Sequence, residues 1–443
     1  MSPARRQRVL DRAVPVIAGA TVVGFALGSS SVPSITHAGH WLRWILLGLL
    51  LLSAGAWGGP RPAVSLSAIA AAVAFLALAL LSTAWSVEPR TTFERAVSLG
   101  FLFSVCVSVA GAVRGRPQRA IAVLHGLLAG AAVVGVAGLV LLAVDHHRAV
   151  QAATYQAPAR FTGLGQDPNT VALLFAVTVP LAVWALLRGR RRPLAAATLA
   201  LLAGTIVASG SHGAVVAGGV GAFVVTVAVL GRSRAALVGA VVVVLCIAVG
   251  AGIQAIPKPS DAATTSSRPA QPSGPKPKRG YLNAEAVYPL GADVGQPLPG
   301  GGQPPVRRGF FGSSGRLEAW QGALHEAARR IVAGHGFGTE QGVFVDRYYR
   351  FVGSLPENSY VGLALQLGVA GLVLLAVLAS VLGRAGIRAL GSPHRDVAAA
   401  GLGVLAAGLV IALVQSYLYS VGNIATAAFW ITAFVLPALD VGV

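Results

Sequence analysis

The residues best suited to chemistry in this chain lie in residues 313–372, where a polar segment leads into a long apolar run. Arg316 lies on the polar side of a short helical pattern, and guanidinium groups on such a helix can meet phosphates at a membrane surface. Glu357 and Asn358 directly precede the apolar run. A carboxylate at that position could accept a proton, or it could only cap the helix and face its dipole.

Residues 313–372 start with this helical pattern, which can begin at Ser313 or Ser314, because both suit an N-cap. Its apolar residues recur at spacings of three and four and form one stripe: Leu317, Trp320, Leu324, Ala328 and Ile331. Gly334 and Gly336 then end the helix, because glycine readily adopts the left-handed backbone of a helix terminus. We therefore predict an amphipathic helix over residues 313–334. It either lies in the membrane interface or packs on its own protein, and both can hold together.

The composition is that of an integral membrane protein. Of the 443 residues, 55% are hydrophobic and only 11% are charged, and the mean hydropathy is +0.71. The formal net charge of +19 comes almost entirely from arginine, which in an Ala-, Gly- and Val-rich chain partly reflects a GC-rich genome. No soluble basic domain with interleaved aromatic residues is present, so we expect no nucleic-acid partner. The charge indicates topology and contact with membrane lipids.

Twelve apolar runs are long enough, or nearly so, to cross about 30 Å of hydrocarbon. Their centres lie near Gly24, Leu49, Ala74, Val105, Val134, Val177, Leu202, Gly221, Val243, Leu372, Ala406 and Ala433. With the N-terminus inside, seventeen arginines fall in cytoplasmic segments and five in short outer ones. This distribution follows the positive-inside rule. We predict about 12 transmembrane helices in the cytoplasmic membrane, with both termini cytoplasmic.

The predicted organisation has four parts. Residues 1–12 form a cytoplasmic tail without a cleavage pattern, residues 13–256 hold transmembrane helices one to nine, and residues 358–443 hold the last three. Between them, residues 257–357 form one large extracytoplasmic loop. Its first part, residues 257–308, is crowded with Pro, Gly, Ser and Gln and predicts a flexible insert.

Metal and disulfide chemistry find little support in the sequence. Cys106 and Cys246 each lie inside an apolar run, so they predict neither a disulfide framework nor a metal site. His146 and His147, beside Asp145, could bind a metal, but adjacent residues make a poor complete site. We therefore expect no metal and no cofactor.

Four separated features resemble the O-antigen ligase and polymerase family of membrane glycosyltransferases. They are LSTAWSVEPRTTFERA from Leu81, RFTGLGQDPNTVALLFAVTVPLA from Arg160, ASGSHGAVVA from Ala208, and GRLEAWQGAL, GHGFG and PENSYVGLALQLGVAGL in the family's order within residues 313–372. The resemblance covers roughly residues 80–440. It implies an all-α integral membrane fold of the GT-C-like class, with the amphipathic helix carried on the large outer loop.

The resemblance also implies an activity. Members transfer a polyprenyl-diphosphate-linked glycan, outside the cytoplasmic membrane and without a metal, to a hydroxyl of a glycan or lipid-glycan acceptor. The departing diphosphate builds up negative charge, which arginine stabilises well because its planar fork stays protonated. Arg160 and Arg316 lie in the matched motifs, so both become catalytic candidates. The alternatives are an interfacial anchor for Arg160 and a solvated helix residue for Arg316.

Two departures from the family pattern concern the same site. Many family ligases have a histidine ahead of the asparagine where this chain has Glu357, and we expect its carboxylate to take the acceptor's proton. His212 stands in SGSHG, where the family often has arginine. It could bind a phosphate oxygen or be a packed, hydrogen-bonded histidine at a helix end. The weaker substrate-binding candidates are Asp167, Asn169, Asn358 and Tyr360.

Other readings stay open. The polar segment QSYLYSVGN, from Gln415 to Asn423, could line a substrate cavity or simply hydrogen-bond neighbouring helices. About twelve spans also suit a flippase or transporter of lipid-linked glycans, although the longest connection lies outside and not between two six-span halves. A peptidoglycan-type polymerase would share the mechanism but use another lipid-linked substrate.

Overall fold

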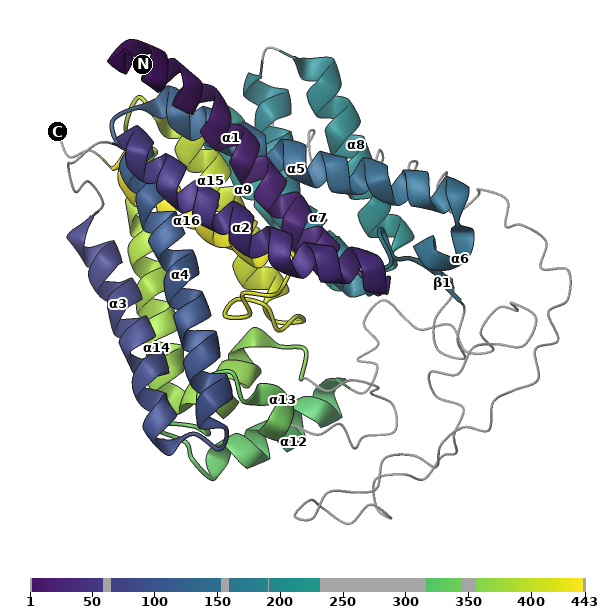
Figure 1. Cartoon of the computed structure of the whole chain (residues 1–443), viewed down its shortest axis with the longest axis vertical. Helices are drawn as coiled ribbons and strands as arrows, with labels where there is room; N and C mark the ends of the chain where they lie inside the picture. The colour runs from purple at the N-terminus through teal and green to yellow at the C-terminus, as the bar shows by residue number, and fades with distance from the viewer. Residues whose placement is uncertain are drawn as a thin grey trace, which may run out of the picture.

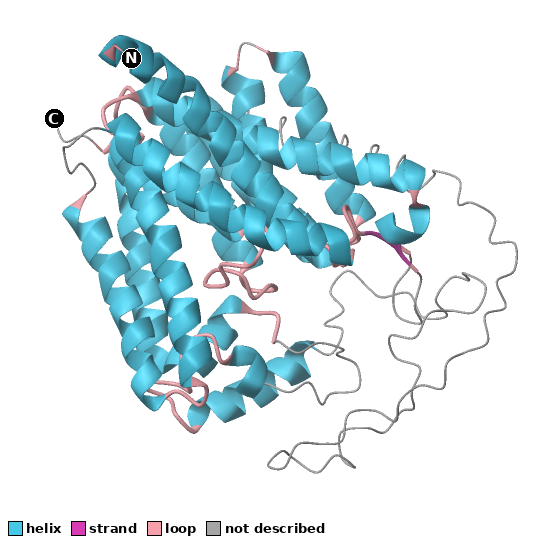
Figure 2. Cartoon of the chain, in the orientation of Figure 1, coloured by secondary structure: helices cyan, strands magenta, loops and turns pink. Residues whose placement is uncertain are grey.

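The computed structural model describes residues 2–58, 65–152, 159–189, 191–231, 316–343 and 356–440. Within these ranges nearly all secondary structure is α-helical (Figures 1 and 2). The long helices are α1 (Pro3–Gly28), α2 (Pro33–Gly58), α3 (Leu66–Leu81), α4 (Pro89–Val113), α5 (Pro117–Val144), α7 (Pro168–Arg188), α8 (Arg192–Ala208), α9 (His212–Leu230), α14 (Ser359–Ala389), α15 (Arg395–Ile411) and α16 (Thr426–Leu439). The short elements are η1 (Ser82–Trp85), α6 (His146–Ala149), α12 (Arg316–Ala328), α13 (Glu340–Val343) and the paired strands β1 (Val150–Gln151) and β2 (Arg160–Phe161).

Eight of the described helices are long and apolar enough to cross a membrane: α1, α2, α3 with η1, α4, α5, α7, α9 and α14. The helices α8 and α16 are apolar but shorter. Eleven of the twelve predicted span centres fall within a described helix. The predicted ninth span around Val243, Cys246 and the predicted insert over residues 257–308 lie outside the described residues. The protein is thus an all-α, multi-pass membrane protein, and the count of twelve spans stays a prediction.

The helices surround a core centred on α7 and α16. Every residue of α16 is buried, and so is nearly all of α7. α7 packs against α8, α9 and α15, and α16 packs against α4, α14 and α15. Small residues allow the closest crossings: a Cβ added at Gly126 or Gly130 of α5 would collide with backbone carbonyls of α1. Such glycine contacts are typical of helices that pack in lipid.

The two chain ends lie at one end of the molecule, and α12 and α13 lie at the other (Figure 1). The connection between α15 and α16 approaches α12 and α13 from the middle of the molecule, and α6 and β1 border the same region. The segments expected to carry chemistry therefore gather far from the termini.

The amphipathic helix is shorter than predicted, and a different face is buried. α12 ends at Ala328, and turns fill residues 329–333 before Gly334 and Gly336 take positive φ values of 63° and 110°. Leu317, Leu324 and Ile331 of the predicted stripe are about half exposed, at 54%, 49% and 58%. The buried face is a row of alanines, Ala319, Ala323 and Ala327, which packs on α13 and α14. α12 therefore docks on its own protein through alanine and leaves an apolar edge free to meet lipid.

α14 begins where the sequence predicts, at Ser359 directly behind Asn358. It is broken at Gly368, whose φ of 62° and ψ of −156° are not helical. The turn over residues 331–336 fills the break, because the N–H groups of His335 and Gly336 donate to the carbonyls of Leu365 and Gln366 at 3.0 and 2.9 Å. On the other side, Val369 and Ala370 donate to the carbonyls of residues 331 and 332 at 2.8 and 3.2 Å. The freed backbone groups of an interrupted membrane helix are thereby satisfied within the protein.

Candidate active site

Arg160 lies on strand β2 and connects the starts of two membrane helices. Its Nε donates to the carbonyl of Ser209 at 2.6 Å, in the turn between α8 and α9. Its Nη2 donates to Oδ1 of Asn169 at 2.7 Å, in the first turn of α7. Gly210, with φ of 64°, passes close beside the guanidinium. The structure thus brings together the sequence features that begin at Arg160 and Ala208.

Asp167 and Asn169 shape the same corner through helix capping. The Asp167 side chain caps α7 and accepts from the backbone N–H groups of Asn169 and Thr170 at 2.8 and 3.3 Å. Asn169 uses its side-chain oxygen to hold Arg160. Asp167 is thus a helix cap near the arginine, and Asn169 orients it.

His212 is the first residue of α9, three positions after the Ser209 carbonyl that Arg160 contacts. Its side chain is half-buried. The predicted phosphate-binding candidate therefore lies at the same helix end as the Arg160 contact.

Arg316 and Glu357 form a hydrogen-bonded ion pair across the loop. Arg316, the first residue of α12, donates from Nε to Oε2 of Glu357 at 3.0 Å, and its Nη2 donates to the same oxygen. The Arg316 side chain is 19% exposed and that of Glu357 is 30% exposed. Both groups are thus shielded from bulk water but still open to a ligand.

Glu357 has a strained backbone in a firmly held turn. Its φ of 48° is positive, which no other described non-glycine residue shows. Such strain persists only where the surroundings impose it, and it gathers at functional sites. Trp320 fixes the turn from α12 by donating to the Pro356 carbonyl at 2.7 Å. On the other side Asn358 caps α14, with its Oδ1 accepting from the N–H groups of Tyr360 and Val361 at 2.9 and 3.1 Å.

The two arginines and the carboxylate form one electrostatic unit. Burial is the largest effect on Arg160 and lowers its pKa; the negative charge of Asp167 raises it, the positive charge of Arg316 lowers it, and the negative charge of Glu357 raises it. Arg160 is thus close enough to Arg316 and Glu357 to feel both charges. Both guanidinium groups stay protonated and can form paired hydrogen bonds with phosphate oxygens, which suits an anionic ligand.

The sequence feature that begins at Leu81 forms hydrogen bonds with residues 333–337, which follow α12. Ser82 Oγ accepts from the N–H of Phe337, the N–H of Val87 donates to the His335 carbonyl, and Trp85 Nε1 donates to the Ala333 carbonyl, each at 3.0 Å. A Cβ at Gly336 would collide with Ser86, so glycine is needed there. The four sequence features that suggested the family thus meet in two pairs, and the charges of Arg316 and Glu357 act on Arg160 across the pairs.

Tyr360 and the polar segment between α15 and α16 serve mainly as hydrogen-bonding partners. The Tyr360 hydroxyl donates to the Leu409 carbonyl at 2.7 Å, and the Tyr417 hydroxyl donates to the Gly408 carbonyl at 2.8 Å. Asn423 accepts from the N–H of Ala425 through its side chain at 3.1 Å. Ser416 and Tyr419 bond to a buried carboxylate, Glu340. Of the two readings left open for this segment, the structure favours bonding within the protein.

Glu340 is the residue at this site that the sequence did not reveal. It stands at the start of α13, only 3% exposed, and is surrounded by polar side chains from α14 and the α15–α16 connection. In the sequence it is a single acidic residue after a glycine-rich turn. Such a residue is typical of an ordinary helix start. Only its burial among polar groups sets it apart.

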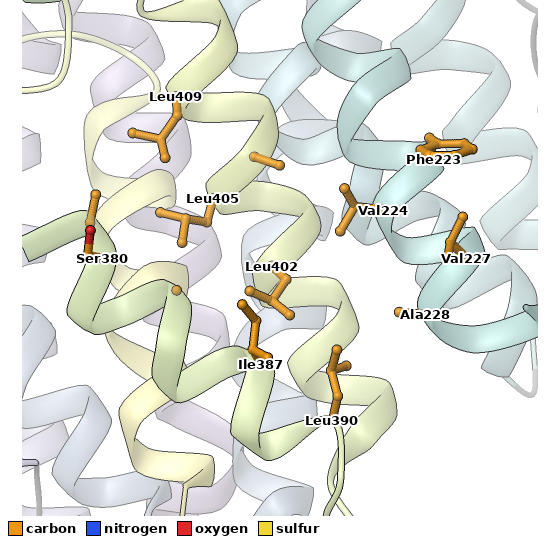
Figure 3. A pocket seen from close by; sticks show the side chains of 13 residues that line it. Phe223, Val224, Val227, Ala228, Ser380, Ile387, Leu390, Leu402, Leu405 and Leu409 are labelled. Carbon is orange, nitrogen blue, oxygen red and sulfur yellow. The ribbon is translucent and has the colours of Figure 1, made fainter. Parts of the chain in front are cut away.

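The described part of the chain holds no cluster of metal-binding side chains, and one groove lies apart from the arrangement above. Among those residues, no group of three or more His, Cys, Asp or Glu side chains could hold a metal ion. A groove of about 590 Å³ lies between α9, α14 and α15 (Figure 3). Its lining is apolar apart from Ser380, with Phe223, Ile387 and Leu402 among its residues. It offers nothing that would orient a sugar or bind a phosphate.

The comparison with protein families covers two of the four sequence features, those that begin at Ala208 and Ser313. The model of a protein family described as O-antigen ligase matches residues 197–376. The matched segment includes His212, Arg316, Glu340 and Glu357, whereas Arg160 precedes it. No curated protein matches the chain.

Proposed function

Since the chain carries a domain of the O-antigen ligase family, whose members are ligases or polymerases acting on glycans, we propose that it is a glycosyltransferase. In this proposal it transfers a polyprenyl-diphosphate-linked glycan to an acceptor hydroxyl on a glycan or lipid-glycan, and so serves cell-surface polysaccharide biosynthesis. The observation that carries the proposal is the hydrogen-bonded pair of Arg316 and Glu357, with Arg160 near enough to feel both charges.

The transfer needs two kinds of group at one place. A bond forms between the acceptor oxygen and the anomeric carbon, while the bond from that carbon to the diphosphate breaks and its electron pair leaves with the phosphate. Arg160 and Arg316 can stabilise the negative charge that builds up on the diphosphate. The acceptor hydroxyl loses its proton, and the Glu357 carboxylate beside Arg316 can take it.

The ion pair of Arg316 and Glu357 gives these steps an order. Glu357 is hydrogen-bonded to Arg316, so its carboxylate is not free to act as a base while the pair lasts. A diphosphate offers Arg316 more negative charge and the same fork-shaped geometry. We infer that the diphosphate takes Arg316 from Glu357, and that the released carboxylate then accepts the proton. Donor binding would thereby switch on the base.

The placement of the site fits transfer at the outer face of the membrane. α12, with its exposed Leu317 and Leu324, lies at the end of the molecule away from both termini (Figure 1). The arginine distribution assigns the termini to the cytoplasmic side. The half-exposed apolar edge of α12 would rest among the lipid headgroups, where the diphosphate of a lipid-linked donor also lies.

The test is transfer by the purified protein in lipid nanodiscs, with a synthetic polyprenyl-diphosphate glycan as donor and a matching glycan acceptor. Arg316→Ala should lower the rate by roughly 100-fold or more, and Arg316→Lys should restore only part of it, because lysine lacks the fork. Arg329→Ala is the matched control, since Arg329 lies just after α12 and pairs with Glu326.

Product and released polyprenyl diphosphate should appear together in the wild type and in Arg329→Ala. Normal transfer by Arg316→Ala would exclude Arg316 from the mechanism. In liposomes, movement of unchanged lipid-linked glycan across the bilayer, with no new glycosidic bond, would show a flippase and overturn the proposal.

A further inference from the structure

Glu340 holds a buried carboxyl group that none of the steps above uses. Three donors surround it: Ser416 Oγ and Tyr419 Oη each lie 2.8 Å from its oxygens, and Gln366 Nε2 lies 3.0 Å away. An ionised carboxylate can only accept hydrogen bonds, and three donors satisfy it well. The hydrogen bonds therefore favour the charged form.

The same group is linked to the turn that carries Glu357. Ser416 Oγ, which donates to Glu340, also accepts the backbone N–H of Asn358 at 3.1 Å. One hydroxyl thus connects the buried carboxylate to the residue after Glu357. Gln366, the second contact, uses its side-chain oxygen to accept the N–H of Gly338 at 2.6 Å.

The packing around the carboxyl leaves little room to adjust. A Cβ at Gly362 would collide with both Glu340 Oε1 and Tyr419 Oη, so α14 can pass only because glycine stands there. The cluster joins α13, the first half of α14 and the α15–α16 connection. A change in the charge of Glu340 must therefore alter contacts on all three.

We propose that Glu340 is a positioning residue for the transfer reaction. As a carboxylate it orients Ser416, which fixes the Asn358 backbone and so holds Glu357 against Arg316. Proton uptake by Glu340 turns an acceptor into a donor, disturbs the Ser416 link and releases the turn. External pH would then control how well the site is assembled. This inference rests on the proposed function.

Burial places this control near neutrality. Burial raises the pKa of Glu340 to about 7, although the hydrogen bonds from Ser416 and Tyr419 and the charge of Arg95 lower it. Two charged residues of the α4 side face this region: the Arg95 chain lies against Gly338, and Glu88 lies against Gly342. Burial also holds the pKa of Tyr419 well above its ordinary value, so this residue remains a donor.

The sign of the effect follows from the raised pKa. As the pH falls through about 7, Glu340 takes up its proton, so transfer should slow on the acidic side. Folding stability should move in the opposite direction. A carboxyl whose folded pKa lies above its ordinary value of 4.5 contributes stability that is complete below that value and lost as the pH rises through about 7. The form suited to transfer is thus the less stable one.

The kinetic test compares the wild type with Glu340→Gln, Ser416→Ala and the control Glu94→Gln, which removes an exposed carboxyl of α4. The wild-type rate should fall below about pH 7, and Glu94→Gln should match it. Glu340→Gln should lose about tenfold in kcat per folded molecule, show little change in donor KM, and have no acid limb near pH 7. Ser416→Ala removes only the hydroxyl that connects Glu340 to the Asn358 backbone, and it should lose kcat by about the same factor.

A second readout does not depend on activity. Trp320 contacts the Pro356 carbonyl, so the fluorescence that Trp320→Phe removes reports on the turn. In nanodiscs this signal should titrate near pH 7 in the wild type and stay flat in Glu340→Gln. An unchanged pH profile in Glu340→Gln, with only a lower melting temperature, would show a purely structural role and overturn the inference. A flat wild-type signal would do the same. If the signal titrates but no transfer occurs under any condition, the proposed function fails and the coupling stands.

Discussion

The guanidinium of Arg316 binds the carboxylate of Glu357, and the two residues stand 41 positions apart in the chain. One begins the amphipathic helix α12 and the other precedes the membrane helix α14. Their contact closes the site, because it joins the surface helix to the membrane bundle beside Arg160. A ligand that separates them would act on both elements at once.

Glu357 should be essential for transfer but not for folding. Glu357→Gln keeps the size of the side chain and removes the base, so the rate should fall roughly 10²- to 10⁴-fold. Glu357→Gly suits the positive φ better than glutamate, so it should melt close to the wild type while losing transfer as well. Transfer assays and melting temperatures in nanodiscs would check both. Full transfer by Glu357→Gln would reduce Glu357 to a helix-start residue.

Arg160 should bind the donor well only while its two hydrogen bonds, to the Ser209 carbonyl and to Asn169, hold the guanidinium in place. Arg160→Lys keeps the charge but cannot reach both the Ser209 carbonyl and Asn169 with a rigid fork, so the donor KM should rise about tenfold. Asn169→Ala, which frees one side of Arg160, should give a smaller rise. The control is Arg148→Lys, because Arg148 is exposed and pairs with Asp145. Steady-state kinetics with varied donor measure the effect, and equal KM values in all four proteins would rule out a role in binding.

The break in α14 should be sensitive to any side chain. At Gly368 a Cβ would collide with the carbonyls of Ile331 and Val332, and φ is positive, so Gly368→Ala should destabilise the fold by about 2 kcal/mol or more. Gly219→Ala is the control, because a Cβ there meets nothing within 4 Å. Melting temperatures of the two variants would decide the matter. Equal values would mean that the break is easily accommodated.

Local signals predicted part of the site well. The start of α14 followed from Pro356, Glu357 and Asn358 ahead of an apolar run, because an asparagine N-cap acts within its own turn. The order of the four sequence features suggested a shared site, and the structure joins them in two pairs whose charged residues act on one another. The apolar runs also located the helices, since hydrophobic length is read directly from the sequence.

Other features depended on contacts that no short stretch encodes. The stripe through Leu317 and Leu324 is the more hydrophobic face of α12, yet the alanine face is buried, because only small side chains let α12 approach α13 and α14 closely. The break at Gly368 arises from a partner segment more than thirty residues away. Glu340 becomes distinctive only when Ser416, Gln366 and Tyr419 meet around it. Sequence spacing alone cannot show such a meeting.

The way the turn over residues 331–336 fills the break in α14 also bears on local opening. The amides of Val369 and Ala370 are protected by the carbonyls of Ile331 and Val332 and not by their own helix. In hydrogen exchange these two amides, deep in a helix sequence, should exchange together with His335 and Gly336, and earlier than their neighbours further along α14. The first half of α14 thus belongs, as a cooperative unit, to the site and not to the bundle.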